Sequence, residues 1–209
     1  MERVRPTISL VIALMVASCF QGAPTFAQTP QDWALCVGQD VTPDLPIEGC
    51  TAIIKTGREV LRRLASAYNN RGVAYRVKAN YAEAIDDFNE AIRLVPDFAN
   101  AFNNRGVAYR NMSDLDRAVV DYDQAIRIKP DYIAAFYNRG LALADKREYR
   151  RAISDFTAVL RVDPKNPTVL YRRGTAYLNS GDIEAGNADL AEAKAIKPDI
   201  AEDISRGGP

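Results

Sequence analysis

Residues 65–98 read ASAYNNRGVAYRVKANYAEAIDDFNEAIRLVPDF, and residues 99–132 read ANAFNNRGVAYRNMSDLDRAVVDYDQAIRIKPDY. Both blocks contain 34 residues, and the same register continues through residues 133–166 and 167–200 without an insertion. A fixed period of this length indicates an array of repeated units rather than a single compact domain. Three columns show the period most clearly: Gly72, Gly106, Gly140 and Gly174; Phe88, Tyr122, Phe156 and Leu190; Pro96, Pro130, Pro164 and Pro198.

The residue types in these columns predict two packed helices in each unit. Gly72 and Ala84 are small where two helices have to cross closely, and Phe88 is large where the crossing opens and volume has to be filled. Apolar residues at helical spacing give the second helix a buried stripe, and the proline near the end of each unit stops that helix. A polar residue beside a proline is placed to cap the following helix: Asp97, Asp131, Asn166 and Asp199.

Units with these columns resemble the tetratricopeptide repeat, in which each unit is a pair of antiparallel helices. The resemblance covers about two-thirds of the chain. It implies an all-α fold, a right-handed superhelix of four helix pairs with an irregular N-terminal cap and a short C-terminal capping helix. The expected units are 65–98, 99–132, 133–166 and 167–200, preceded by residues 28–64 and followed by a cap and tail over residues 201–209.

Residues 1–27 have the pattern of a secretory signal peptide. Arg3 and Arg5 precede an apolar run that is too short to span a bilayer, and the Thr-Phe-Ala sequence at 25–27 predicts cleavage before Gln28. Val-Ala-Ser-Cys at 16–19 also resembles a lipoprotein signal, in which Cys19 carries the lipid. We therefore expect an exported, periplasmic protein without a transmembrane segment in its mature form, with a membrane-anchored lipoprotein as the alternative.

Two cysteines remain in the mature part of the chain. Cys36 and Cys50 lie 14 residues apart, and export to an oxidising compartment favours a disulfide between them over two buried thiols. Cys50 also falls one period before Ala84, so residues 28–64 contain a degenerate unit. The prolines between Asp40 and Pro46 argue against an ordinary first helix there, and residues 58–64 are expected to extend the first regular helix backwards.

One column departs from the pattern of the family. An arginine precedes each of the four glycines, where an apolar residue is common, and an aspartate recurs with the same period on the facing helix. Matched columns of bases and acids predict a series of structural ion pairs, which set helix register more than they add stability. The expected pairs are Arg71 with Asp87, Arg105 with Asp121, Arg139 with Asp155 and Arg173 with Asp189.

The resemblance also implies a groove on the inner side of the superhelix, lined by the first helix of each unit. Asparagine amides there suit a peptide backbone, arginines suit carboxylates, and tyrosines give rigid contact area. The alternative is that asparagines such as Asn70, Asn104 and Asn138 only satisfy neighbouring backbone groups and follow the family pattern. The groove positions are Asn69, Asn70, Val73, Arg76, Asn103, Asn104, Val107, Arg110, Tyr137, Asn138, Leu141, Tyr171, Arg172 and Thr175.

Composition argues against several classes of function. The chain has 27 basic and 27 acidic residues and no histidine, which argues against a nucleic-acid partner, histidine-based catalysis and histidine-ligated metal. No cofactor motif is present, and paired carboxylates such as Asp86 and Asp87 are explained by a solvated helix face. We expect a non-catalytic scaffold of the bacterial envelope that binds a protein or peptide, with an acidic or C-terminal segment favoured. Self-assembly through the open ends is the alternative.

Overall fold

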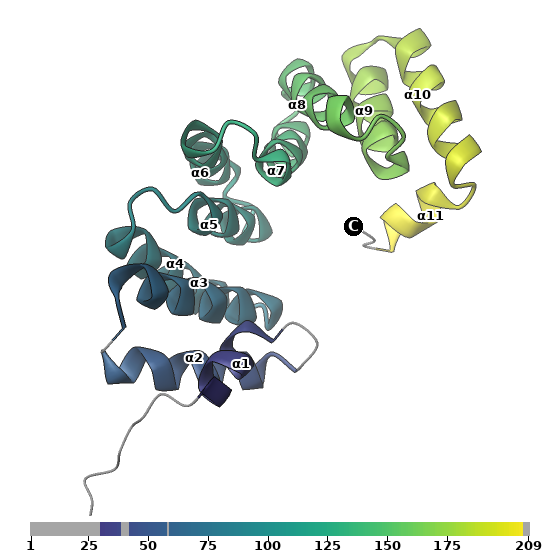
Figure 1. Ribbon diagram of the computed structural model, residues 1–209. Coiled ribbons are helices and arrows are strands. Elements are labelled where there is room, and N and C mark those ends of the chain that lie inside the picture. The colour runs from purple at the N-terminus through teal and green to yellow at the C-terminus, as the bar shows by residue number, and fades with distance from the viewer. Residues whose placement is uncertain (1–29, 39–41, 58, 207–209) are drawn as a thin grey trace, which may run out of the picture.

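The structure is a computed structural model that describes residues 30–38, 42–57 and 59–206 (Figure 1). The expected signal segment, Gln28 and Cys19 lie outside these residues. The described part of the chain forms eleven α-helices and contains no strand. The helices are α1 (Pro30–Val37), α2 (Asp44–Thr56), α3 (Leu61–Val77), α4 (Tyr81–Leu94), α5 (Ala99–Asn111), α6 (Leu115–Ile128), α7 (Ile133–Asp145), α8 (Tyr149–Val162), α9 (Pro167–Ser180), α10 (Ile183–Ile196) and α11 (Ile200–Ser205).

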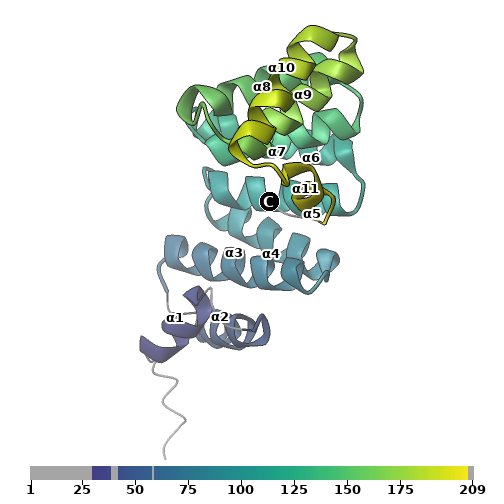
Figure 2. The same cartoon turned by 90° about the vertical axis from the view of Figure 1, so that its right-hand side faces the viewer.

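The helices stack as antiparallel pairs along a curved array (Figures 1 and 2). Each first helix packs against its own second helix and against the second helix of the preceding pair. Successive first helices, α3, α5, α7 and α9, also contact one another and lie on the inner side of the curve. This arrangement confirms the all-α superhelix that the resemblance to the tetratricopeptide repeat implies.

The glycine column permits the close crossing within each pair. A Cβ atom added to Gly72 would lie 2.7 Å from a ring carbon of Phe88, and one added to Gly106 would lie 2.7 Å from a ring carbon of Tyr122. The aromatic ring therefore occupies the space that a side chain on the first helix would need. In the last unit, where Gly186 replaces the usual alanine, a Cβ would lie 2.6 Å from Leu178, so the Leu178 side chain fills that space.

All four expected arginine–aspartate pairs are present. In each pair the arginine donates two hydrogen bonds of 2.7–2.9 Å to the two oxygens of the aspartate in its own unit. Burial raises the pKa of Asp87 and of Asp121, and the hydrogen bonds from Arg71 and Arg105 oppose this shift. The third bond of each arginine reaches the second helix of the preceding pair, so the ion pairs also fasten neighbouring units. Its acceptors are Thr51, Asn89, Asp123 and Thr157.

The turn between the two helices of each unit requires a left-handed backbone residue. This residue is Ala79, Ser113 and Arg147 in the first three units, with φ of 59°, 62° and 63°, and Gly181 in the fourth, with φ of 93°. The four positions are one period apart. Glycine adopts this conformation without steric cost, whereas other residues do so with strain.

The helix caps agree with the sequence only in part. The Asn166 side chain accepts a hydrogen bond from the Val169 amide, as expected for an N-cap. Asp97 and Asp131 were expected to cap α5 and α7, and this prediction is wrong: the cap positions are Phe98 and Tyr132, which make no side-chain cap bond. The aspartates are instead bound through their main-chain carbonyls to the amides two residues later. At the C-terminal end, α11 buries Ile200 against the core and closes the array.

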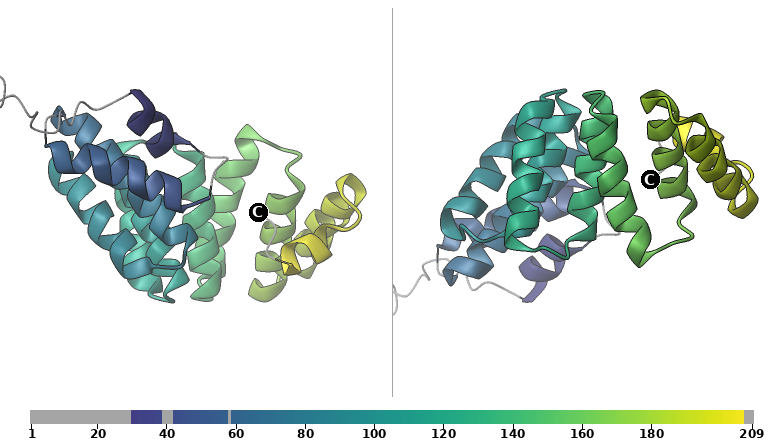
Figure 3. Two further views of the ribbon diagram at one scale, coloured as in Figure 1. Left: turned by 90° about the horizontal axis from the view of Figure 1, so that it is seen from below. Right: turned by 90° about the horizontal axis from the view of Figure 1, so that it is seen from above.

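The N-terminal segment forms a further pair, α1 and α2, which lies over the end of the array in the view from below (Figure 3). Pro46 lies in the first turn of α2, where a backbone amide has no partner within the helix, so the proline does not disrupt it. The first helix of this pair is the short α1, which ends at Val37, before the prolines. The expected extension of α3 over residues 58–64 is too long. Gly57, in the left-handed conformation, ends α2, and α3 begins at Leu61 after Val60.

Candidate functional site

The groove residues expected from the sequence lie on the first helices of the array. Several of them contribute to packing as well. Asn69 and Asn103 are buried, and Val107, Tyr137 and Tyr171 pack partly buried against the main core. By helix, the residues are Asn69, Asn70, Val73 and Arg76 on α3; Asn103, Asn104, Val107 and Arg110 on α5; Tyr137, Asn138 and Leu141 on α7; and Tyr171, Arg172 and Thr175 on α9.

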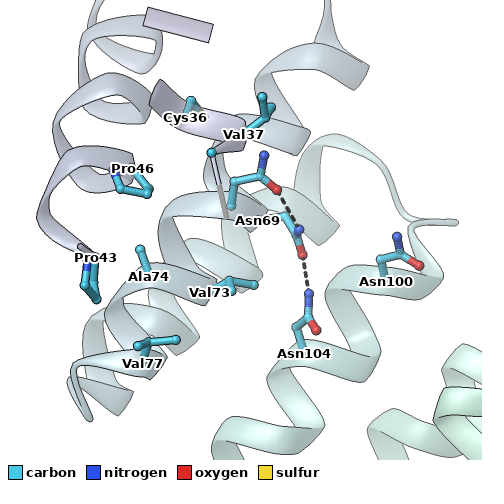
Figure 4. A pocket seen from close by; sticks show the side chains of 12 residues that line it. Cys36, Val37, Pro43, Pro46, Asn69, Val73, Ala74, Val77, Asn100 and Asn104 are labelled. Carbon is cyan, nitrogen blue, oxygen red and sulfur yellow. Dashed lines mark hydrogen bonds between the residues drawn. The ribbon is translucent and has the colours of Figure 1, made fainter. Parts of the chain in front are cut away.

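A pocket of about 510 Å³ lies where α3 and α5 face the end of α1 and the start of α2 (Figure 4). We call it the N-terminal pocket. Its lining combines apolar side chains with amides, and none of the lining residues that the structure describes is charged. The lining residues are Cys36, Val37, Gly38, Pro43, Pro46, Asn69, Asn70, Val73, Ala74, Val77, Asn100 and Asn104.

The asparagines of the pocket are connected to one another. Asn69 Nδ2 donates to Asn70 Oδ1 at 3.2 Å, and Asn104 Nδ2 donates to Asn69 Oδ1 at 2.9 Å (Figure 4). Asn69 is therefore a buried structural link between α3 and α5. The Nδ2 group of Asn70 and the Oδ1 atom of Asn104 have no protein partner in the described part of the chain, so they offer a donor and an acceptor to a ligand.

The same link recurs one unit further along the array. Asn138 Nδ2 donates to Asn103 Oδ1 at 2.9 Å, which connects α7 to α5 as Asn104 connects α5 to α3. In the next unit the corresponding positions hold Tyr137 and Arg172, and no hydrogen bond joins them. Asn69 and Asn103 are buried, and their side-chain oxygens accept hydrogen bonds from the amides of Asn104 and Asn138.

The arginines of the inner face differ in their partners. Arg110 pairs with Asp145 of the next unit at 2.8 Å, so its charge is already neutralised. Arg76 and Arg172 have no carboxylate partner among the described residues, and the Nε atom of each is buried without an acceptor. The Tyr122 hydroxyl is also buried without a partner, and burial raises the pKa of this hydroxyl, which keeps it protonated.

Four contacts fix the wall of the pocket that α1 and α2 form. The disulfide between Cys36 and Cys50 ties the end of α1 to the middle of α2. Gly49 lets the two helices touch, because an added Cβ would lie 2.8 Å from the Asp32 carbonyl oxygen. In the middle of α1, Trp33 Nε1 donates to Glu59 at 3.1 Å, and the Arg63 guanidinium lies 4.5 Å from the centre of the Trp33 ring.

The sequence did not predict the remaining lining residues, which are Val37, Gly38, Pro43 and Pro46 of this wall, Ala74 and Val77 of α3, and Asn100 of α5. Val37, Pro43 and Pro46 belong to a segment in which the repeat pattern is degenerate. One signal was available, because Gly38 falls 34 residues before Gly72 and extends the glycine column by one unit. Asn100 has no such signal, since its column holds a different residue in each unit.

Comparison with known families identifies the array. Two sequence models, both described as tetratricopeptide repeat, match this chain, one at residues 65–98 and 99–132 and the other at residues 137–199. Together they cover more than half of the chain. The chain belongs to the tetratricopeptide repeat family. Proteins with this repeat are generally non-catalytic scaffolds that bind other proteins.

Tetratricopeptide repeat structures of low sequence identity share the fold. A crystal structure of MamA is 19% identical, with a TM-score of 0.65, and the alignment covers 77% of this chain and 85% of MamA. MamA from Desulfovibrio magneticus is 22% identical, with a TM-score of 0.62 and coverages of 68% and 85%. YrrB, described as having an unusual peptide-binding site, is 22% identical, with a TM-score of 0.63 and coverages of 87% and 99%. A search of curated proteins found no significant match.

Two further features bear on the kind of site. Within the described ranges, no helix has the length and apolar character needed to cross a bilayer. Among the same residues, no cluster of three or more histidine, cysteine, aspartate or glutamate side chains is arranged to hold a metal ion. The N-terminal pocket, with its amides and apolar walls, is the candidate site that the geometry supports.

Proposed function

We propose that this tetratricopeptide repeat protein is a non-catalytic scaffold that binds an extended segment of a partner protein in the N-terminal pocket and along the adjoining inner face. The observation that carries the proposal is the pairing of a free donor on Asn70 with a free acceptor on Asn104 in one pocket. An extended main chain alternates N–H and C=O groups, so it complements such a pair.

Preorganisation supports the same function. Asn70 and Asn104 are held by hydrogen bonds to Asn69, so a ligand does not have to order their side chains. Immobilising a flexible side chain on binding typically costs about 0.5–1.5 kcal/mol, and that cost is reduced here. The peptide-binding site described for YrrB, which has the same fold, is consistent with the proposal.

The sequence favours an acidic or C-terminal segment because of Arg76 and Arg110. Arg110 already pairs with Asp145, so it is not free to bind a ligand carboxylate. Arg76 and Arg172, which have no carboxylate partner among the described residues, are the inner-face arginines able to do so. A carboxylate of the partner is thus a contact outside the N-terminal pocket, since neither arginine lines it.

We further propose that the protein works in the bacterial envelope after removal of residues 1–27. The signal-like N-terminus and the Cys36–Cys50 disulfide, which needs an oxidising compartment, support this location. The intact mass of protein isolated from the native cell tests it, with a chain that starts at Gln28 as the expected result. A diacylglyceryl group on Cys19 would instead make the protein a membrane-anchored lipoprotein.

The binding function is tested by selecting peptides from a random library on the mature protein and measuring their affinity by titration calorimetry. Replacing Asn70 and Asn104 together with alanine should weaken a selected peptide about tenfold or more, because two hydrogen bonds are lost. Asn80→Ala is the matched control, since Asn80 is exposed and its side chain makes no cap bond. Equal affinities for the wild type and the double variant would contradict the proposal.

A further inference from the structure

We propose that the N-terminal pocket selects an aliphatic side chain carried on an uncharged stretch of the partner. The inference rests on the proposed function and adds the chemistry of the segment that is bound. It differs from the sequence-based expectation of an acidic ligand, because the groups that meet the ligand in the pocket are apolar or amide groups.

The apolar lining comes from both sides of the pocket. Val73 and Val77 lie on α3, Val37 lies at the end of α1, and Pro43 and Pro46 lie at the start of α2 (Figure 4). Val37 and Val77 are 54% and 60% exposed in the free protein, although both are large apolar residues. Burying them under an aliphatic side chain of the ligand removes apolar surface from water, which is favourable.

Two charges that adjoin this lining neutralise each other. Asp44 follows the lining residue Pro43, and Lys78 follows Val77, and the Lys78 ammonium lies 2.5 Å from the Asp44 carboxylate. A ligand carboxylate or ammonium would leave water and find amides but no opposite charge among the described lining residues. Burying a charge without a partner is costly, so the pocket disfavours charged side chains of either sign.

The shape of the pocket is set before a ligand arrives. The disulfide and the close contact at Gly49 hold α1 to α2. The Arg63 guanidinium over the Trp33 ring and the hydrogen bond from Arg71 to Thr51 hold this pair against α3. The volume of about 510 Å³ exceeds that of one aliphatic side chain, which leaves room for the flanking main chain beside Asn70 and Asn104. One apolar anchor with hydrogen-bonded main chain on both sides is the ligand that fits.

Four capped ten-residue peptides test the inference in a protein-observed NMR titration. They consist of alternating serine and threonine with a central leucine, serine, glutamate or lysine. The leucine peptide should bind about tenfold more tightly than the serine peptide and shift the amide signals of Val37, Val73 and Val77, because one buried leucine contributes that much. The glutamate and lysine peptides should bind no more tightly than the serine peptide.

Variants of the pocket separate this inference from the proposed function. The double variant Val37→Ser with Val77→Ser should lose the preference for the leucine peptide. The control, Val120→Ser with Val162→Ser, should keep it, because these valines are 66% and 67% exposed on the outer helices α6 and α8. The inference is wrong if the glutamate or lysine peptide binds most tightly on the inner face, or if all four peptides bind there equally. Either result would leave the proposed function standing. If no peptide shifts any inner-face signal, both are wrong.

Discussion

Arg105 holds both carboxylate oxygens of Asp121, with hydrogen bonds of 2.8 Å from Nε and 2.7 Å from Nη2. Its remaining terminal nitrogen, Nη1, donates a hydrogen bond of 2.6 Å to Asn89 Oδ1 of the preceding unit. One side chain therefore joins the two helices of its own unit and fastens that unit to its neighbour. Since the arrangement recurs in all four units, the ion pairs run through the whole array.

Removing one partner of this pair should be far more damaging than removing both. Asp121→Ala leaves a half-buried guanidinium without its carboxylate and should lower the free energy of unfolding by about 3 kcal/mol. Arg105→Met combined with Asp121→Leu should be more stable than Asp121→Ala, because no unpaired charge stays buried. Urea denaturation measures both. Glu90→Ala, which breaks an exposed pair with Arg93, is the control and should cost less than about 0.5 kcal/mol.

The Tyr122 hydroxyl should be a liability for stability. It is buried without a hydrogen-bond partner in the described part of the chain, whereas the same column holds Phe88 and Phe156 in neighbouring units. Tyr122→Phe should therefore raise the free energy of unfolding by about 1 kcal/mol. Phe156→Tyr is the reverse experiment and should lower it by a similar amount. A destabilised Tyr122→Phe variant would show that the hydroxyl is satisfied in solution.

Glycine should be more stable than any other residue at the left-handed position of each turn. Ala79→Gly, Ser113→Gly and Arg147→Gly relieve a positive φ and should each raise the free energy of unfolding by about 0.5–1 kcal/mol. Gly181→Ala should lower it by about 1 kcal/mol. Thermal unfolding of the four variants measures this. If the three glycine variants were less stable than the wild type, the turn conformation described here would be wrong.

Loss of the disulfide should affect one end of the molecule. Replacing Cys36 and Cys50 with serine removes a cross-link over 14 residues, which should cost the N-terminal pair about 3 kcal/mol. Each unit of a repeat array contacts only its neighbours, so the distant helices should be unaffected. In hydrogen–deuterium exchange we expect faster exchange in α1 and α2 and unchanged rates in α7 to α10. Uniformly faster exchange would mean that the segment stabilises the whole array.

These features differ in how far the sequence predicts them. The four ion pairs were predictable, because each lies within one unit and both of its columns keep a fixed period. The Asn69–Asn104 link was not, because it joins different units, and its geometry depends on how α3 and α5 are offset. The N-terminal pocket was missed for a related reason. Five of its twelve lining residues come from a segment where the period fades, and only a few positions there, such as Gly38 and Cys50, continue a column.

The central claim, that the partner binds on the inner face near the N-terminal pocket, is tested most directly by photo-crosslinking in the native cell. A benzophenone amino acid would replace Asn100, an exposed residue of the pocket, or Val120, an exposed residue on the outer surface of α6. We predict a specific crosslinked product from position 100 that weakens when Asn70 and Asn104 are replaced with alanine, and no such product from position 120. A product from position 120 alone would contradict the claim.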